Sequence, residues 1–227
     1  MNRAFRTPLL LTLMCLALAG VPALAQTLYD TGGPELPSLV GTKIGSGQVG
    51  ETPIVDVSWF CGNPGGCNVE DMTFWAFVDN PNVAPAPVSV RWLLSGGVPF
   101  DFKAGISGQA TNINQVGDCL PAENQGMVCE FHFDFGGSVV QPFGLDWLNL
   151  YQLDDGRIPG DVFWSNSDGT GQDSQTLILD LNGNITQYPS PLAFSISGVA
   201  APEPGSMLLL GSGLVGAVAY ARRRFLL

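Results

Sequence analysis

The sequence predicts an all-β protein whose main part is a single antiparallel β-sandwich of the jelly-roll type. Hydrophobic residues make up 45% of the 227 positions and charged residues only 13%, which provides enough apolar material for a core and excludes a mainly disordered chain. The 29 glycines and 17 prolines interrupt every helical pattern of apolar residues in the central part of the chain. Apolar residues recur there at every second position instead, as in strands with one buried face.

Four segments show this alternation most clearly, namely 54–60, 72–79, 88–95 and 127–135. Further strands are predicted at 143–153, 161–165, 176–181 and 192–197, and Gly-, Pro- and Asn-rich turns separate most of them. Eight or more short strands with this spacing are typical of a sandwich. The residues expected on the buried face of the first four segments are Val55, Val57 and Trp59; Met72, Phe74, Ala76 and Val78; Val88, Val90, Trp92 and Leu94; and Met127, Cys129, Phe131, Phe133 and Phe135.

Residues 1–25 have the pattern of a secretory signal peptide. Arg3 and Arg6 provide a positive start, residues 9–18 form a short apolar stretch, and residues 23–25 read Ala-Leu-Ala before Gln26. The apolar stretch is too short for a membrane anchor and is followed by Gly20 and Pro22. We expect export through the Sec translocon and removal of residues 1–25 by signal peptidase.

The C-terminus consists of three parts in a fixed order. Pro202, Glu203 and Pro204 come first, then 17 uncharged residues at 205–221, and then the run Arg222, Arg223 and Arg224. Seventeen helical residues cover about 25 Å, slightly less than the roughly 30 Å of a bilayer core. Arginines beside a membrane span stay on the cytoplasmic side, so the body of the protein would lie outside.

This arrangement over residues 199–227 resembles a PEP-CTERM sorting signal, in which a Pro-Glu-Pro motif precedes a membrane helix and an arginine run. The resemblance implies a Gram-negative host, an inner-membrane intermediate held by the helix, and cleavage near the motif by the membrane protease exosortase. The product would reach the cell surface or the extracellular matrix. An ordinary C-terminal membrane anchor is the alternative. The resemblance implies nothing about the fold or activity of the body, residues 26–198.

The body is strongly acidic. Over residues 26–201 four basic and 19 acidic side chains give a formal charge of −15. Such a surface repels polyanions, and the clustered Lys and Arg residues that contact phosphates are missing, so nucleic-acid binding is excluded.

Four cysteines remain after the signal peptide: Cys61, Cys67, Cys119 and Cys129. An even number in an exported protein indicates disulfides. The segment between Cys61 and Cys67 is rich in turn residues, and a nine-residue polar loop separates Cys119 from Cys129. These spacings favour the two local pairs over the other connectivities, and they differ from those of zinc sites.

Glu130, His132 and Asp134 alternate along one predicted strand and point to its polar face. Neighbours on one face lie about 6–7 Å apart along a strand, so one ion cannot bind all three unless the strand bends. The alternation resembles the catalytic strand of laminarinase-type jelly-roll endoglucanases. However, Asp134 stands where that family has its second glutamate and His132 replaces the middle aspartate, so the activity is not carried over. A solvated polar face is the simpler interpretation.

Trp75 lies opposite the apolar face of its strand and is the tryptophan best placed for a surface role, such as stacking on a sugar ring. Two loops rich in oxygen side chains offer candidate Ca²⁺ ligands, Asp168 and Asp173 in one and Asp180 and Asn182 in the other. Neither matches an EF-hand, and turns rich in Asp and Asn are the simpler interpretation of both loops. We therefore expect no cofactor, with Ca²⁺ at these loops as the alternative.

Two functions from different classes follow from these observations. The first is a non-catalytic, exported surface or matrix protein that binds polysaccharide or other matrix material, or merely occupies the envelope. The candidate ligand-binding residues are Trp75, Glu130 and His132. The second is a secreted glycan-active hydrolase of jelly-roll type that uses carboxylates such as Glu130.

Overall fold

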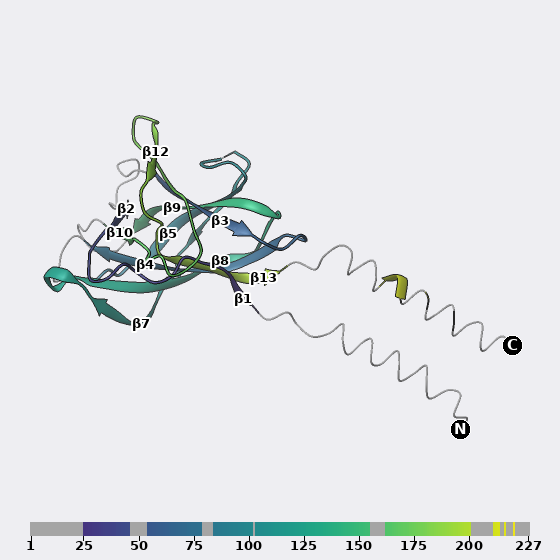
Figure 1. The fold of residues 1–227 in the computed structure, drawn as a ribbon, viewed down its shortest axis with the longest axis horizontal. Helices are drawn as coiled ribbons and strands as arrows, with labels where there is room; N and C mark the ends of the chain where they lie inside the picture. Colours follow the sequence, from purple (N-terminus) through teal and green to yellow (C-terminus); the bar gives the residue numbers. More distant parts are fainter. Residues whose placement is uncertain are drawn as a thin grey trace, which may run out of the picture. The chain divides into compact units, whose positions relative to one another are not determined.

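The computed structural model describes residues 25–45, 54–78, 84–101, 103–154 and 162–200, and residues 211–213, 216 and 220 near the C-terminus. Contacts within the chain group Ala25–Ala201 into one compact unit, while residues 1–24 and 202–227 form another. The first of these units is the β-rich body in Figure 1.

The strands of the body form two sheets in which every pair is antiparallel. The seven-stranded sheet has the order β1-β13-β4-β10-β2, and β8 pairs with the other edge of β4 and with β7. The six-stranded sheet has the order β12-β11-β3-β9-β5-β6. The strands are β1 (Gln26–Asp30), β2 (Gly41–Gly45), β3 (Ile54–Cys61), β4 (Cys67–Val78), β5 (Ser89–Gly96), β6 (Ile106–Ala110), β7 (Asn114–Pro121), β8 (Met127–Gln141), β9 (Gly144–Asp154), β10 (Val162–Ser165), β11 (Thr176–Leu179), β12 (Ile185–Tyr188) and β13 (Phe194–Ala200).

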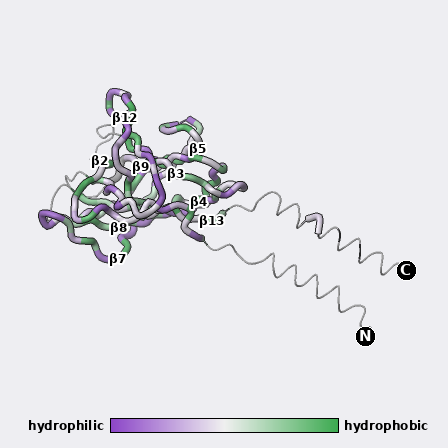
Figure 2. The backbone as a smooth tube through the Cα atoms, in the orientation of Figure 1, coloured by the Kyte–Doolittle hydropathy of each residue, from purple (hydrophilic) through white to green (hydrophobic). Residues whose placement is uncertain are grey.

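One hydrophobic core contains side chains from both sheets. From the seven-stranded sheet, Phe74 contacts Phe131, Phe133 and Trp164, with ring centroids 5.8–6.3 Å apart. Trp92 of the six-stranded sheet meets Phe135 of the other sheet edge-to-face at 4.8 Å. Buried and less buried residues alternate along much of β4 and β8, and Figure 2 shows hydrophobic and hydrophilic residues mixed within the body. Burial of one face of each sheet therefore explains why the period-two segments fold as strands.

The predicted antiparallel all-β fold is confirmed, while the jelly-roll type stays a prediction. Several positions differ from the expected alternation. On the expected outer face, the buried residues include Asp56, Ser58, Leu93, Ser95 and Val128. Val88 is 48% exposed because β5 begins one residue later, at Ser89. Met127, the first residue of β8, is half-buried. Phe77, which should point outward, is buried because its ring stacks on that of Phe163 in β10 at 5.2 Å.

Both local cysteine pairs lie at disulfide distance. The Cys61–Cys67 bond has a Cα–Cα distance of 5.9 Å and links the end of β3 to the start of β4, which belong to different sheets. The Cys119–Cys129 bond, with a Cα–Cα distance of 4.3 Å, joins β7 to β8.

The predicted signal peptide, residues 1–25, lies outside the described residues except for Ala25. Of the predicted membrane helix, residues 205–221, the structure describes five residues, and these are helical. Within the part of the chain that is described, no helix has the length and apolar character needed to cross a membrane.

Candidate functional site

The outer face of the seven-stranded sheet carries the polar residues predicted on β8. Three cross-strand pairs of β4 and β8 form it: Trp75 opposite Glu130, Thr73 opposite His132, and Asp71 opposite Asp134. Residues directly opposite each other in antiparallel strands project to the same face. The structure thus brings together Trp75, Glu130 and His132, and adds Asp71, which the sequence analysis missed.

An irregularity in β8 adjoins this face. The pairing shifts from Val69–Val139 to Asp71–Asp134, so β8 contains three more residues than β4 over this interval. The extra residues include Gly136 and Gly137, whose φ angles are +82° and +149°. Glycine adopts such angles without the strain that a Cβ would cause. The bulge therefore sets the register that places Asp134 opposite Asp71.

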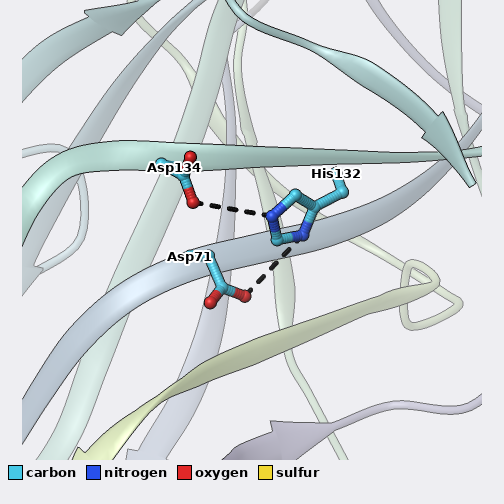
Figure 3. A group of neighbouring side chains, drawn as sticks. All are labelled: Asp71, His132 and Asp134. Atoms are coloured by element: carbon cyan, nitrogen blue, oxygen red, sulfur yellow. Dashed lines mark ion pairs between the residues drawn. The ribbon is translucent and has the colours of Figure 1, made fainter. Parts of the chain in front are cut away.

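His132 lies between the two carboxylates (Figure 3). Its Nδ1 is 3.8 Å from Asp71 Oδ1, and its Nε2 is 3.5 Å from Asp134 Oδ1. Asp71 and His132 are partly buried, whereas the Asp134 side chain is 73% exposed. Because each ring nitrogen faces a different carboxylate, a protonated His132 would form an ion pair on both sides.

The same three side chains could hold a metal ion by proximity alone, since their ligand atoms lie within 4.8 Å of one another. An ion would need one ring nitrogen and both carboxylates as neighbours at about 2.0–2.2 Å. The carboxylates instead lie at opposite nitrogens of the ring. The arrangement fits a histidine held between two carboxylates better than a metal centre.

Glu130 and Trp75 form the other half of this face. Both side chains are half-buried. Burial, and then the negative charge of Asp30, raises the pKa of the Glu130 carboxyl, while His132 lowers it. The other four tryptophans are buried, with exposures of 0–4%, so Trp75 is the tryptophan that this surface can offer to a ligand.

The candidate calcium ligands serve as turn residues. Asp168 Oδ1 accepts hydrogen bonds from the amide and hydroxyl of Thr170, at 2.9 and 2.7 Å. Asp180 accepts three bonds from Asn182 and Asn184, at 2.8–2.9 Å, and those from Asn184 contribute most to lowering its pKa. The backbone carbonyl of Asp173 accepts a bond from the Tyr29 hydroxyl. The contacts of Asp168 and Asp180 are those of Asx turns, whereas the Asp173 bond joins residues far apart in the sequence.

The predicted sorting residues, Pro202, Glu203, Pro204 and Arg222–Arg224, lie outside the described residues. The sequence itself identifies them. Residues 200–224 match the family model of the PEP-CTERM protein-sorting motif, a match confined to the C-terminal segment. No curated protein and no solved structure matches the chain. The motif implies export, processing by the membrane protease exosortase, and a place at the cell surface or outside the cell. The chain thus carries a PEP-CTERM protein-sorting motif at its C-terminus.

Proposed function

We propose that this protein is a non-catalytic β-sandwich that is exported, held briefly in the inner membrane, and released or displayed after cleavage of its C-terminal segment. The match of residues 200–224 to the sorting motif carries this proposal. The marginal length of the uncharged segment 205–221 supports a temporary anchor. The two prolines of the motif disfavour a regular helix interior, which supports recognition of this segment by a protease.

Replacing Pro202, Glu203 and Pro204 by alanines tests the sorting step in the native host. We expect export to continue and an uncleaved precursor to accumulate in the membrane fraction, because the protease loses its recognition segment. Alanine replacement of the exposed residues Ile185, Thr186 and Gln187 in β12 is the control and should leave processing unchanged. Normal processing of the triple-alanine motif variant would contradict the proposal.

The ligand-binding part of the proposal concerns the outer face of the seven-stranded sheet. Trp75 offers one half-buried indole beside Glu130, and Thr73 and His132 add hydrogen-bonding groups in the next cross-strand pair. An aromatic ring next to polar groups is the combination with which protein surfaces hold a sugar ring. We therefore propose polysaccharide as the ligand class.

A polysaccharide pull-down tests this face. Trp75→Ala should weaken binding about tenfold if the stacking contact contributes about 1.4 kcal/mol. Ile185→Ala, an exposed change on the other sheet, should have no effect. Equal binding by both variants and the wild-type protein would exclude Trp75 from the ligand site.

The same assay separates binding from hydrolysis. The raised pKa of Glu130 would suit a general acid. Its same-strand partner Asp134 lies four residues further on, about 13 Å away along an extended strand, whereas glycosidases hold their two carboxyl groups about 5–9.5 Å apart. We expect binding without released sugar, and reducing ends that appear with wild-type protein but not with Glu130→Gln would establish the hydrolase instead.

A further inference from the structure

Four large apolar side chains are exposed together at one end of the body. Phe60, Phe143 and Leu145 are 47%, 54% and 46% exposed, and Val98 is 57% exposed. The rings of Phe60 and Phe143 meet edge-to-face at 5.6 Å, and Phe60 is the cross-strand partner of Leu145. The amide of Gly97 donates to the Leu145 carbonyl at 2.9 Å, which brings Val98 to the same place. We call Phe60, Val98, Phe143 and Leu145 the end patch.

The end patch lies at the end of the body from which the C-terminal segment leaves. Ala200, the last residue of β13, pairs with Cys67, and Cys67 also pairs with Gln141 at the end of β8. The Cys61–Cys67 disulfide connects this point to the end of β3, next to Phe60. Figure 1 shows β3 and β13 ending on the same side of the body.

This end is almost free of charge, although the body carries −15. The three stretches that form it, residues 57–69, 92–100 and 135–145, contain no Asp, Glu, Lys or Arg. The loop between β5 and β6 continues with Asp101 and Lys103, whose opposite charges sum to zero. An anionic lipid surface repels acidic protein surfaces, so this end can approach a bilayer at a lower electrostatic cost than the rest of the molecule.

We propose that the end patch rests on the lipid surface of the inner membrane while the protein is anchored by its C-terminal segment. This inference rests on the proposed sorting route. Between Ala200 and the uncharged segment that begins at Gly205, the chain can extend no more than about 18 Å. A body held this close to a membrane-anchored segment can bring its exposed aromatic and aliphatic residues to the membrane interface, which favours such side chains. Docking there would hold the Pro-Glu-Pro segment close to the bilayer, within reach of a membrane-embedded protease.

Lipid-quenching fluorescence tests the contact with the full chain reconstituted in vesicles of phosphatidylethanolamine and phosphatidylglycerol. Cys15 is replaced by Ser, and an environment-sensitive dye is attached at Phe143→Cys or, as the control, at Leu181→Cys. Leu181 is exposed and follows β11, whose last residue pairs with Ile54 at the far end of β3. A quencher on the lipid headgroups should reduce the signal at position 143 at least about threefold more strongly than at position 181, because only the end patch enters the interface.

A second comparison separates docking from tethering. Phe60→Ser with Leu145→Ser, in the Phe143→Cys background, removes the apolar contact but keeps the tether, and quenching should fall to the control level. Leu181→Ser with Ile185→Ser should leave it unchanged, and equal thermal melting of both variants verifies their folding.

Three outcomes overturn the proposal in distinguishable ways. Equal quenching at positions 143 and 181 means that the end patch does not touch lipid. Quenching that survives the Phe60 and Leu145 changes means that the tether alone brings this end close. If these two changes slow tail cleavage in the host while quenching is equal at both positions, the patch binds a protein. The sorting route has its own readout, because a chain that does not float with the vesicles has no membrane anchor, and then both proposals fail.

Discussion

At the scale of single residues, two aspartates of the six-stranded sheet are buried. Asp146 lies on the core face opposite Trp59, and neither of its side-chain oxygens has a hydrogen-bond partner among the described residues. Asp56 lies on the outer face, where the loop after β5 covers it and Phe100 donates its amide to Oδ2 at 2.6 Å. Burial raises the pKa of each carboxyl to about 7, although the Phe100 bond opposes this for Asp56.

These two groups predict that the protein loses stability as the pH rises. Each carboxyl binds its proton more tightly in the folded state, where its pKa is about 7, than in the unfolded chain, where it is 3.8. Their contribution to the free energy of unfolding should therefore be highest below pH 4, fall between pH 4 and pH 7, and then level off. The difference corresponds to about 4 kcal/mol per group as an upper limit.

Urea unfolding of Asp146→Asn at pH 4.5 and pH 8 measures this directly. The variant should be more stable than the wild-type protein at pH 8 and should show a smaller loss between the two pH values. Asp134→Asn removes an exposed carboxylate and is the control. A wild-type stability that increases from pH 4.5 to pH 8 would contradict the assignment.

The hydrogen bonds of the loop aspartates lead us to expect that the stability of the protein does not depend on calcium. Both carboxylate oxygens of Asp180 and one of Asp168 already accept hydrogen bonds from their own turns. We expect the same melting temperature in 1 mM Ca²⁺ and in excess EDTA, to within about 1 °C, because an ion bound to the folded state alone would raise it. A calcium-dependent increase that Asp180→Ala abolishes would show that this loop is a calcium site.

At the scale of elements, the Cys61–Cys67 disulfide closes the β3–β4 connection between the two sheets. Its sequence separation of 6 residues is small, and the chain-entropy model gives about 2–3 kcal/mol for such a loop. Both cysteines are also buried in the core, which adds the packing of their side chains.

Replacing both Cys61 and Cys67 by alanine should lower the free energy of unfolding by about 2–3 kcal/mol. The matched variant, Cys119→Ala with Cys129→Ala, removes a bond between adjacent strands of one sheet and should cost a similar amount. Non-reducing peptide mapping checks the pairing itself. A peptide that joins Cys61 to Cys119 or to Cys129 would refute it.

The strands predicted from sequence include the four with a clear period of two, β3, β4, β5 and β8. They contribute alternate residues to one core, so burial leaves a pattern in the sequence. The strands missed are β1, β2, β6, β7 and β12. Most positions of β7 and β12 are exposed, so no apolar alternation marks them.

The candidate site was predicted in part for the same reason. The alternation of side chains along a strand was enough to place Trp75 on the outer face of its strand. It also placed Glu130, His132 and Asp134 together on the polar face of theirs. Asp71 could not be found in this way, because it reaches His132 only through the register of β4 against β8 and the bulge at Gly136. The burial of Asp146 could have been predicted from the sequence. It is separated from the core residues Leu148 and Leu150 by two and four positions, so all three side chains point to the same face of the strand.

At the scale of the whole molecule, an acidic body precedes a sorting segment at residues 200–224. The body's negative charge repels polyanions, its polar sheet face is the proposed ligand site, and its uncharged end contains Ala200, after which the C-terminal segment begins. Each feature fits a protein that passes through the inner membrane and functions outside it.

The mass of the mature protein, isolated from the native host, tests the central claim most directly. Cleavage near Pro202-Glu203-Pro204 predicts a product that lacks residues 205–227 and has no membrane-spanning segment. The uncleaved form should be confined to the inner-membrane fraction of cells that express the alanine-substituted motif. A mature protein whose C-terminus is still Leu227 would mean that the segment is a permanent anchor, and the sorting account would be wrong.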